Sequence, residues 1–517
     1  MSVFSQGLSR SSTVGALLTA IRKRQLPAGV VGTAHIHKVL LVHTAVEESG
    51  RRALLFAADE AEAARLCADL QALGTDALLF PAKDLSLREV EASSREYEQQ
   101  RLGVLGRMQQ GNWQVAVASI EAALQFTLPP QTLAAHTLTL TVGEDLPVTD
   151  LPSALVAAGY ERCEQIEGAG QFAVRGGIVD IYPAFYAEPI RLELWGDAVD
   201  SLYTVDLISQ RRTEPLSQVV IPPATELLIP NAEELAERLT AYADGLNGKA
   251  ADGRALLYTA AASLRTGVRP ASPERFRRLI DDKPATLPDY APDARWFLSE
   301  PSRLREQAIA VEQLLGEEIA HLLEEQKLCK GLTEYRQKWG YFIENCAEQD
   351  AVLLDAFTRT TSEVPLKNLF PLTAQQLPVW GGKFDLLTED LRDTQARGDT
   401  CVVLGGADEK SVRALTDDLV KNGFAARFEP SLTDERGQIL VMRGGLSAGA
   451  SFPDASFTVV TRGTAVASRK KHRFRKAAKG AEIRSIAELK LGDYIVHSAH
   501  GIGRYNGIVQ LTVQGVS

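Results

Sequence analysis

The sequence predicts a multidomain α/β protein. Strand-like and helix-like segments alternate through the first ~145 residues, short paired strands without intervening helices follow from about Leu151, and a further strand–helix–strand pattern begins at Thr400. Alternating strands and helices are typical of a parallel sheet covered by helices, whereas consecutive short strands joined by tight turns are typical of an antiparallel sheet. A chain of 517 residues is long enough for about three to five such domains.

The first α/β part rests on three strand–helix units. The apolar run at residues 52–59 predicts a buried strand, and the amphipathic pattern at residues 60–74 predicts a helix that ends at Gly74. In the second unit, "DALLFP" predicts a strand and "EVEASSREYEQQRLGVLGRMQQG" a long helix. In the third, "WQVAVASIEAALQF" predicts a strand followed by a helix. The acidic ends of "LLFAADE" and "VVLGGADE" imitate a helicase-type acidic box, but each precedes an ordinary helix, and we interpret them as helix-capping residues.

The middle of the chain predicts an antiparallel insert followed by helices. The strands lie in "QFAVRGGIVDIYPA" and "PIRLELWGDAVDSLYTVDL", and the second stretch turns at Gly196–Asp197. Alternation along it predicts two faces, Ile190, Leu192 and Leu194 against Arg191, Glu193 and Trp195. Helical periodicity returns from Asn231 and again over residues 302–330.

Charge and cysteine content exclude several classes of protein. The net charge of −10 argues against a chain that coats nucleic acid with its whole surface. The five cysteines are scattered without a CxxC pair, which favours neither a zinc site nor a disulfide framework. The sequence shows neither a secretory leader nor an apolar run of about 18 residues, so we expect a cytoplasmic protein with no membrane contact.

A basic run at residues 468–480 contains seven Lys and Arg residues and little apolar material. We interpret it as an exposed linker. The alternative is contact with DNA phosphates, for which the candidates are Arg469, Lys470, Lys471, Arg473, Arg475 and Lys476.

The stretch "GVVGTAHIHK" has the outline of a phosphate-binding loop without its reactive residues. With Gly29 and Gly32 in register with G-x-x-x-x-G-K-[ST], His35 stands where the lysine is needed and Ile36 where the magnesium-binding hydroxyl is needed. In "RWFLSEPS", Ser299 stands where a helicase-type acidic box needs its aspartate. Two interpretations remain, a decayed nucleotide site and a chance pair of glycines. His37 and Lys38 fall beyond the motif.

Four stretches together resemble the N-terminal half of bacterial transcription-repair coupling factors. They are "GVVGTAH", "FPAKDLSLREVEASSREYEQQRLGVL" with "VAVASIEAALQ", "FAVRGGIVDIYPA…PIRLELWGDAVDSL" and "GDYIVHSAHGIGRYNGI". The resemblance implies a UvrB-like, degenerate P-loop helicase-type parallel sheet with an inserted mixed or antiparallel β domain. It further implies a small α/β domain and the truncated start of a Tudor- or CarD-like β-barrel, and it favours the decayed nucleotide site.

The domain boundaries that the resemblance implies run along the whole chain. They are 1–145 with 285–390 for the degenerate nucleotide-binding-type domain, 146–230 for the inserted UvrA-binding domain, 231–284 for a helical part, 398–466 for the small α/β domain, 467–488 for the basic linker and 489–517 for the start of an RNA-polymerase-interaction domain.

The resemblance also assigns partners to residues. It places UvrA on the insert, with Arg162, Arg175, Tyr182 and Arg191 as candidates, against the alternative of an ordinary solvated sheet face. It places the β subunit of RNA polymerase near Ile508 and Leu511, a contact expected to be weak or absent if that domain is cut short.

The expected function is recruitment of UvrA to stalled RNA polymerase in transcription-coupled nucleotide excision repair. We expect no catalytic residue, no metal (the His497 and His500 pair is too few ligands) and no cofactor in this chain. In the family, ATP and magnesium serve a C-terminal motor that translocates on double-stranded DNA, and this sequence does not supply that motor. The alternatives are an active UvrB-type ATPase that handles damaged DNA and a general DNA-binding module that uses the basic run.

Overall fold

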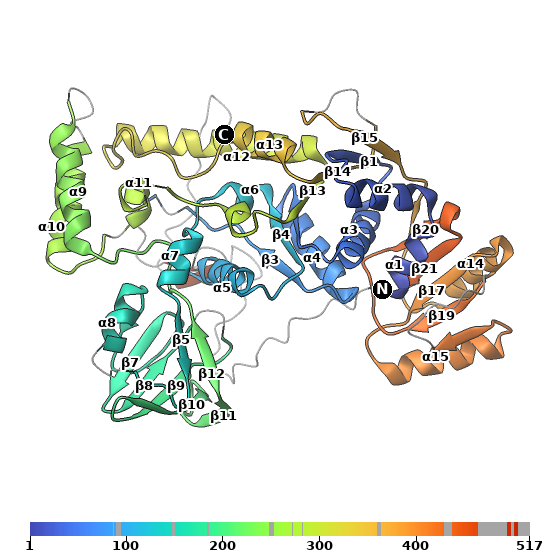
Figure 1. Cartoon of the computed structure of the whole chain (residues 1–517), viewed down its shortest axis with the longest axis horizontal. Coiled ribbons are helices and arrows are strands. Elements are labelled where there is room, and N and C mark those ends of the chain that lie inside the picture. The colour runs from blue at the N-terminus through green and yellow to red at the C-terminus, as the bar shows by residue number, and fades with distance from the viewer. Residues whose placement is uncertain are drawn as a thin grey trace.

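The computed structural model describes residues 1–85, 87–88, 95–146, 150–183, 186–247, 253–270, 272–281, 283–358, 363–428 and 437–463, and the backbone of 494–497 and 501–504. Its centre is a sheet of seven parallel strands (Figure 1). In order across the sheet these are β15 (Asn368–Pro371), β1 (Ala28–Val31), β14 (Ala351–Asp355), β13 (Arg295–Ser299), β2 (Ala53–Ala57), β4 (Val115–Ser119) and β3 (Ala77–Phe80). The chain between β4 and β13 is therefore an excursion from the sheet.

Helices cover both faces of this sheet, as parallel strands require. One face carries α1 (Val3–Leu8), α2 (Ser12–Arg22), α3 (His35–Ser49) and α4 (Glu60–Ala72), and the other carries α5 (Glu96–Gln110), α6 (Ile120–Leu124), α12 (Pro301–Glu324) and α13 (Trp339–Glu348). Successive side chains of one strand enter two different cores, Leu55 with the first set of helices and Phe56 with the second. The predicted parallel α/β sheet is confirmed.

The helix starts follow the sequence closely. The Asp59 carboxylate caps α4 by accepting the Glu62 N–H at 2.8 Å. The Asp408 carboxylate caps α15 (Glu409–Lys421) by accepting the Ser411 N–H at 2.9 Å. Both residues are helix caps, as predicted. The helix predicted from residue 89 is described only from Glu96, because residues 89–94 lie outside the described residues.

After α6, the excursion passes through α7 (Pro130–Ala135) and then forms the predicted insert, which projects away from the parallel sheet (Figure 1). Its main sheet has the order β11 (Arg212–Leu216), β10 (Ala198–Val205), β9 (Ile190–Trp195), β8 (Ile178–Ile181), β7 (Gln171–Arg175) and β6 (Glu161–Arg162). All pairs are antiparallel except β6 with β7. A helix, α8 (Asp150–Ala157), and a strand pair, β5 (Leu138–Thr141) with β12 (Gln218–Ile221), complete the insert.

Helices α9 (Ala232–Gly245), α10 (Arg254–Arg265) and α11 (Arg277–Ile280) follow the insert and pack around a small core of their own. The second α/β unit lies at the other end of the molecule (Figure 1). Its mixed sheet has the order β16 (Gln375–Leu377), β20 (Gly449–Phe452), β21 (Phe457–Thr461), β17 (Thr400–Leu404), β19 (Ile439–Met442) and β18 (Ala426–Phe428), with α14 (Phe384–Arg397) and α15 beside it.

The two α/β units share one core. Phe452 and Phe457 of the second unit pack in the same apolar cluster as α1 and α3 of the first, and the Ser11 hydroxyl donates to the Asp454 carboxylate at 2.5 Å. The last described segment is an antiparallel pair, β22 (Tyr494–His497) with β23 (Gly501–Arg504), which agrees with the strands predicted there. Among the described residues, no helix is long and apolar enough to cross a membrane.

Candidate functional site

The phosphate-loop outline does not form a phosphate-binding loop of the expected shape. Gly29 lies within strand β1, paired on both sides, and not in a loop, which corrects its predicted position. A Cβ on Gly29 would stand 2.9 Å from the side chains of Leu366 and Leu369, so close packing explains the glycine. Gly32 has φ +88°, and a Cβ there would stand 2.6 Å from the Leu372 carbonyl oxygen. Both glycines therefore serve the backbone of the fold.

The loop between β1 and α3 directs its backbone donors inward. The Thr33 N–H donates to the Asp355 carbonyl at 3.0 Å. The Ala34 N–H donates to the His37 Nδ1 at 3.0 Å, so the side chain of His37 caps its own helix. A phosphate cradle needs such N–H groups free to face the ligand. Here both are already engaged within the chain.

The residues in place of the reactive lysine and hydroxyl have structural contacts. The His35 Nε2 lies 2.9 Å from the Asp69 Oδ2, and the same carboxylate accepts the Ser447 N–H at 2.9 Å and the Ser447 hydroxyl at 2.5 Å. His35 thus belongs to a polar seam between the two α/β units. The Ile36 side chain is fully buried in their shared core.

Lys38, which sequence reasoning set aside, reaches the end of β13. Its Nζ donates to the Ser299 hydroxyl at 3.0 Å and to the Glu300 carboxylate at 2.7 Å. The Ser299 hydroxyl in turn donates to the Glu62 carboxylate at 2.7 Å. All four side chains are nearly buried. The place of an acidic box is thus filled by an internal, charge-paired cluster. The sequence around Lys38 could not reveal this contact, because its partner Glu300 lies 262 residues away along the chain.

The outer face of the insert carries a charged ladder. Asp180 lies opposite Arg191 on the neighbouring strand, and its carboxylate accepts the Nε and Nη2 of Arg191 at 2.6 and 2.9 Å. The Nη2 of Arg175 donates to the same carboxylate at 2.5 Å. The hydrogen bond to Asp180 raises the pKa of Arg191. The Arg175 side chain remains 48% exposed, but that of Arg191 is only 14% exposed. Arg191 was expected to bind a carboxylate of UvrA, but its bidentate carboxylate partner is Asp180 of this chain.

An exposed tryptophan continues this face. Glu193 and Trp195 follow Arg191 on the same side of β9, as the predicted alternation requires, and Trp195 is 83% exposed. The Glu193 carboxylate pairs with Arg212, whose guanidinium also lies over the Tyr203 ring at 4.8 Å. Arginine and tryptophan are enriched at interface hot spots. The composition of this face is therefore that of a protein-binding surface.

The remaining predicted candidates lie apart from this ladder. Register pairs Arg162 with Phe172, a core residue, so Arg162 does not share the face of Arg175. Tyr182 follows the end of β8, and its hydroxyl donates to the Ala187 carbonyl at 3.3 Å. The polymerase candidates Ile508 and Leu511 lie outside the described residues. The same holds for the DNA-contact candidates Arg469, Lys470, Lys471, Arg473, Arg475 and Lys476.

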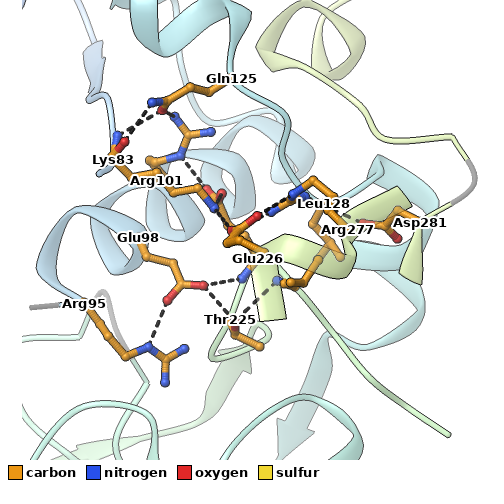
Figure 2. Close-up of polar contacts among 12 residues, drawn as sticks. Lys83, Arg95, Glu98, Arg101, Gln125, Leu128, Thr225, Glu226, Arg277 and Asp281 are labelled. Atoms are coloured by element: carbon orange, nitrogen blue, oxygen red, sulfur yellow. Dashed lines mark hydrogen bonds and ion pairs between the residues drawn. The ribbon is translucent and has the colours of Figure 1, made fainter. Parts of the chain in front are cut away.

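Sequence reasoning missed a buried charge cluster where the chain returns from the insert (Figure 2). Glu226, fully buried, accepts the Arg101 Nε at 2.6 Å and pairs with the Lys83 Nζ at 2.9 Å. Lys83, in the segment after β3, also donates to Glu274 at 2.8 Å, which links the cluster to the turn before α11. Arg101 shares the buried face of α5 with Leu105. An arginine on the apolar face of a predicted helix was the sequence feature that could have indicated a buried ion pair.

A second contact of this cluster holds the returning chain to α5. The Glu98 carboxylate accepts the Thr225 hydroxyl at 2.7 Å and the Glu226 N–H at 2.8 Å (Figure 2). Burial acts to raise the pKa of Glu98, but the charges of Arg95 and Lys83 and these hydrogen bonds outweigh it and lower the pKa. The insert is therefore attached through ionised side chains.

The described residues contain no group of three or more His, Cys, Asp or Glu side chains placed to hold a metal ion. All five cysteines are free thiols. Burial raises the pKa of the Cys67 and Cys346 thiols to about 12, which keeps both protonated and unreactive at neutral pH.

Two family models match parts of the chain, and several relatives match most of it. Residues 138–227 match the family model described as UvrB interaction domain, and residues 489–517 match that described as CarD-like/TRCF RID domain. The transcription-repair-coupling factor of Bacillus subtilis is 30% identical in an alignment 515 positions long that covers 96% of this chain and 43% of that protein. Those of Staphylococcus aureus and Staphylococcus epidermidis are 27% and 25% identical, over 42% and 38% of their length. The chain thus spans less than half the length of these relatives.

Proposed function

Because the chain is homologous to the N-terminal ~43% of transcription-repair-coupling factor, with its UvrB interaction domain and the start of its CarD-like/TRCF RID domain, we propose that it recruits UvrA to stalled RNA polymerase in transcription-coupled nucleotide excision repair. The observation that carries the proposal is the outer face of the insert. It combines an exposed guanidinium, Arg175, with an exposed indole, Trp195, on one rigid antiparallel sheet.

Within this proposal we assign the two arginines different roles. Arg175 is half exposed and is the direct contact with acidic groups of UvrA. Arg191 is nearly buried and holds the Asp180 carboxylate, which in turn orients Arg175. Arg191 therefore contributes to binding by positioning Arg175 and does not itself touch UvrA.

The test is equilibrium binding of UvrA to the whole chain, measured by surface plasmon resonance. Arg175→Ala and Trp195→Ala are each expected to weaken binding about tenfold or more, as interface hot spots do. The matched control is Arg238→Ala on α9, a surface arginine of similar exposure (41%) outside the insert. Unchanged affinity for both Arg175→Ala and Trp195→Ala would place the UvrA contact elsewhere.

We further propose that this chain does not hydrolyse ATP at the loop after β1. Support comes from the engaged Thr33 and Ala34 N–H groups and from the Lys38–Glu300 ion pair at 2.7 Å. The rival function, an active UvrB-type ATPase, requires magnesium-dependent hydrolysis. We expect no turnover above background in a coupled phosphate-release assay. Turnover that Lys38→Met abolishes would establish the rival function.

The remaining partners of the proposal are RNA polymerase and DNA. The match of residues 489–517 supports a polymerase contact through that segment. Contact of residues 468–480 with DNA is a second candidate, and it rests on the seven basic residues of that run. It predicts affinity for random duplex that falls steeply with salt and is lost when this run is replaced by Gly and Ser.

A further inference from the structure

A large hollow lies beside the buried charge cluster and has no role in UvrA recruitment. Its volume is about 860 Å³, within the range of small-molecule binding sites. Its walls come from the segment after β3, the start of α5, the chain that returns from the insert, the segment before α11 and the helix α12. Figure 2 shows one wall of it, with Arg95, Glu98 and Thr225.

Arg336 is a cation in this wall without adequate compensation. Its side chain is 8% exposed, and the Glu121 carboxylate stands 4.0 Å from its Nη2. Its Nε and Nη1 are buried and have no hydrogen-bond partner among the described residues. A buried guanidinium normally has its donors satisfied, because an unpaired buried charge is costly. Burial lowers the pKa of Arg336 and raises that of Glu121, so neither charge fully stabilises the other.

The same hollow also offers aromatic and aliphatic surface. Tyr97 at the start of α5 is 40% exposed, and Val311, Leu314 and Leu315 of α12 line the same space. An anion alone does not fill about 860 Å³ and has no use for an apolar wall. A ligand that matches both the guanidinium and the apolar surface carries an anionic group and a flat or apolar body.

We propose that this hollow binds an organic phosphate of nucleotide size, with the phosphoryl group on Arg336 and the organic part against Tyr97 and α12. Guanidinium groups suit phosphate oxygens because they present several fixed donors. The ligand would supply the partner that Arg336 lacks. Because the unpaired nitrogens are themselves buried, binding requires the guanidinium to turn toward the hollow.

The test is isothermal titration of the whole chain with adenosine monophosphate, with adenosine as the probe that lacks the phosphate. We expect adenosine to bind at least tenfold more weakly, and Arg336→Gln to weaken the monophosphate at least tenfold, the usual loss for a charge-assisted hydrogen bond. The matched control is Arg278→Gln, a half-exposed arginine of α11 outside the hollow. A 5′-phosphorylated and an unphosphorylated oligonucleotide form the second pair of probes. Preference for the phosphorylated one identifies a strand end as the source of the phosphate, and equal affinity identifies the free nucleotide.

Two results would overturn the proposal. One is the absence of saturable binding of every phosphorylated probe, and the other is unchanged monophosphate binding by Arg336→Gln. Glu121→Gln is a second variant that does not depend on loss of Arg336. It keeps the guanidinium and removes the competing carboxylate, so it should bind the monophosphate severalfold more tightly, a gain that misfolding would not produce. Capture of UvrA by Arg336→Gln should equal that of the unaltered chain, so failure of this inference and failure of UvrA recruitment are separate results.

Discussion

Replacing Glu226 by glutamine should loosen the attachment of the insert while keeping side-chain size and shape. Glu226 is fully buried and binds two cations, the Arg101 Nε at 2.6 Å and the Lys83 Nζ at 2.9 Å. Removing one partner of a buried pair typically costs ~3–5 kcal/mol, because the other charge stays buried without compensation. Lys83 keeps Glu274, and Arg101 keeps the Pro81 carbonyl, so we expect the lower end of that range.

Hydrogen exchange of the α5 amides is the appropriate measurement, because it reports the opening of this junction separately from that of the other cores. A loss of ~3 kcal/mol corresponds to about 100-fold faster exchange of the slowest α5 amides. The control is Glu234→Gln, which breaks the exposed Glu234–Arg238 pair on α9 and should leave α5 unchanged.

A double variant separates charge pairing from packing. Arg101→Met with Glu226→Leu removes both charges and fills the space with apolar atoms, which is often neutral or stabilising for a buried pair. Exchange in this variant should return most of the way to that of the unaltered chain. If Glu226→Gln speeds α5 exchange less than about fivefold, the cluster does not hold this junction, and the reasoning from burial is refuted.

Two further predictions concern the loop after β1 and the helix that follows it. Gly32→Ala should lower the stability of the folded chain by ~2 kcal/mol or more, because φ at Gly32 is +88° and the new Cβ would stand 2.6 Å from the Leu372 carbonyl oxygen. Gly50→Ala is the control: its φ is +61° but its Cβ would meet open space, so it should cost only ~1 kcal/mol. Equal melting temperatures for the two variants would contradict this reasoning. Burial lowers the pKa of His37 and His43 below the ordinary 6.5. Unfolding therefore takes up protons below about pH 6.5, and stability should fall as pH drops from there. His37→Gln with His43→Gln should flatten that part of a pH–melting curve, and an unchanged slope would exclude the two histidines as its cause.

The sequence predicted local structure well because local structure depends on neighbouring residues. The apolar run at residues 52–59 became β2, Ala53–Ala57, and the acid before the following helix became its cap. Alternation along β9 placed Leu192 in the core and Trp195 in solvent, as expected. Periodicity and capping chemistry act over a few residues, so one sequence is enough to find them.

The candidate sites were harder to predict because their contacts join distant residues. Asp180 is opposite Arg191 only once the register of β8 and β9 is known, and that register turned an exposed arginine into a nearly buried one. Lys38 meets Glu300, and Arg101 meets Glu226, across separations of 262 and 125 residues. The motif "GVVGTAHIHK" misled in one respect, because Gly29 is a strand residue.

The contacts of this loop explain why a glycine pattern can be present without a phosphate-binding loop. Gly29 and Gly32 are each required by a close approach of the chain between Leu366 and Leu372, whatever the loop binds. The positions that would face a phosphate are under no such restraint, and there His35 bonds Asp69 in the seam with the second α/β unit, while Ile36 joins the shared core. A lysine placed at position 35 alone would therefore remove a contact of that seam and would still lie beside backbone N–H groups that are already hydrogen-bonded. We expect His35→Lys to weaken the contact between the two α/β units without creating an ATPase. The loop after β1 therefore serves to hold these two units together.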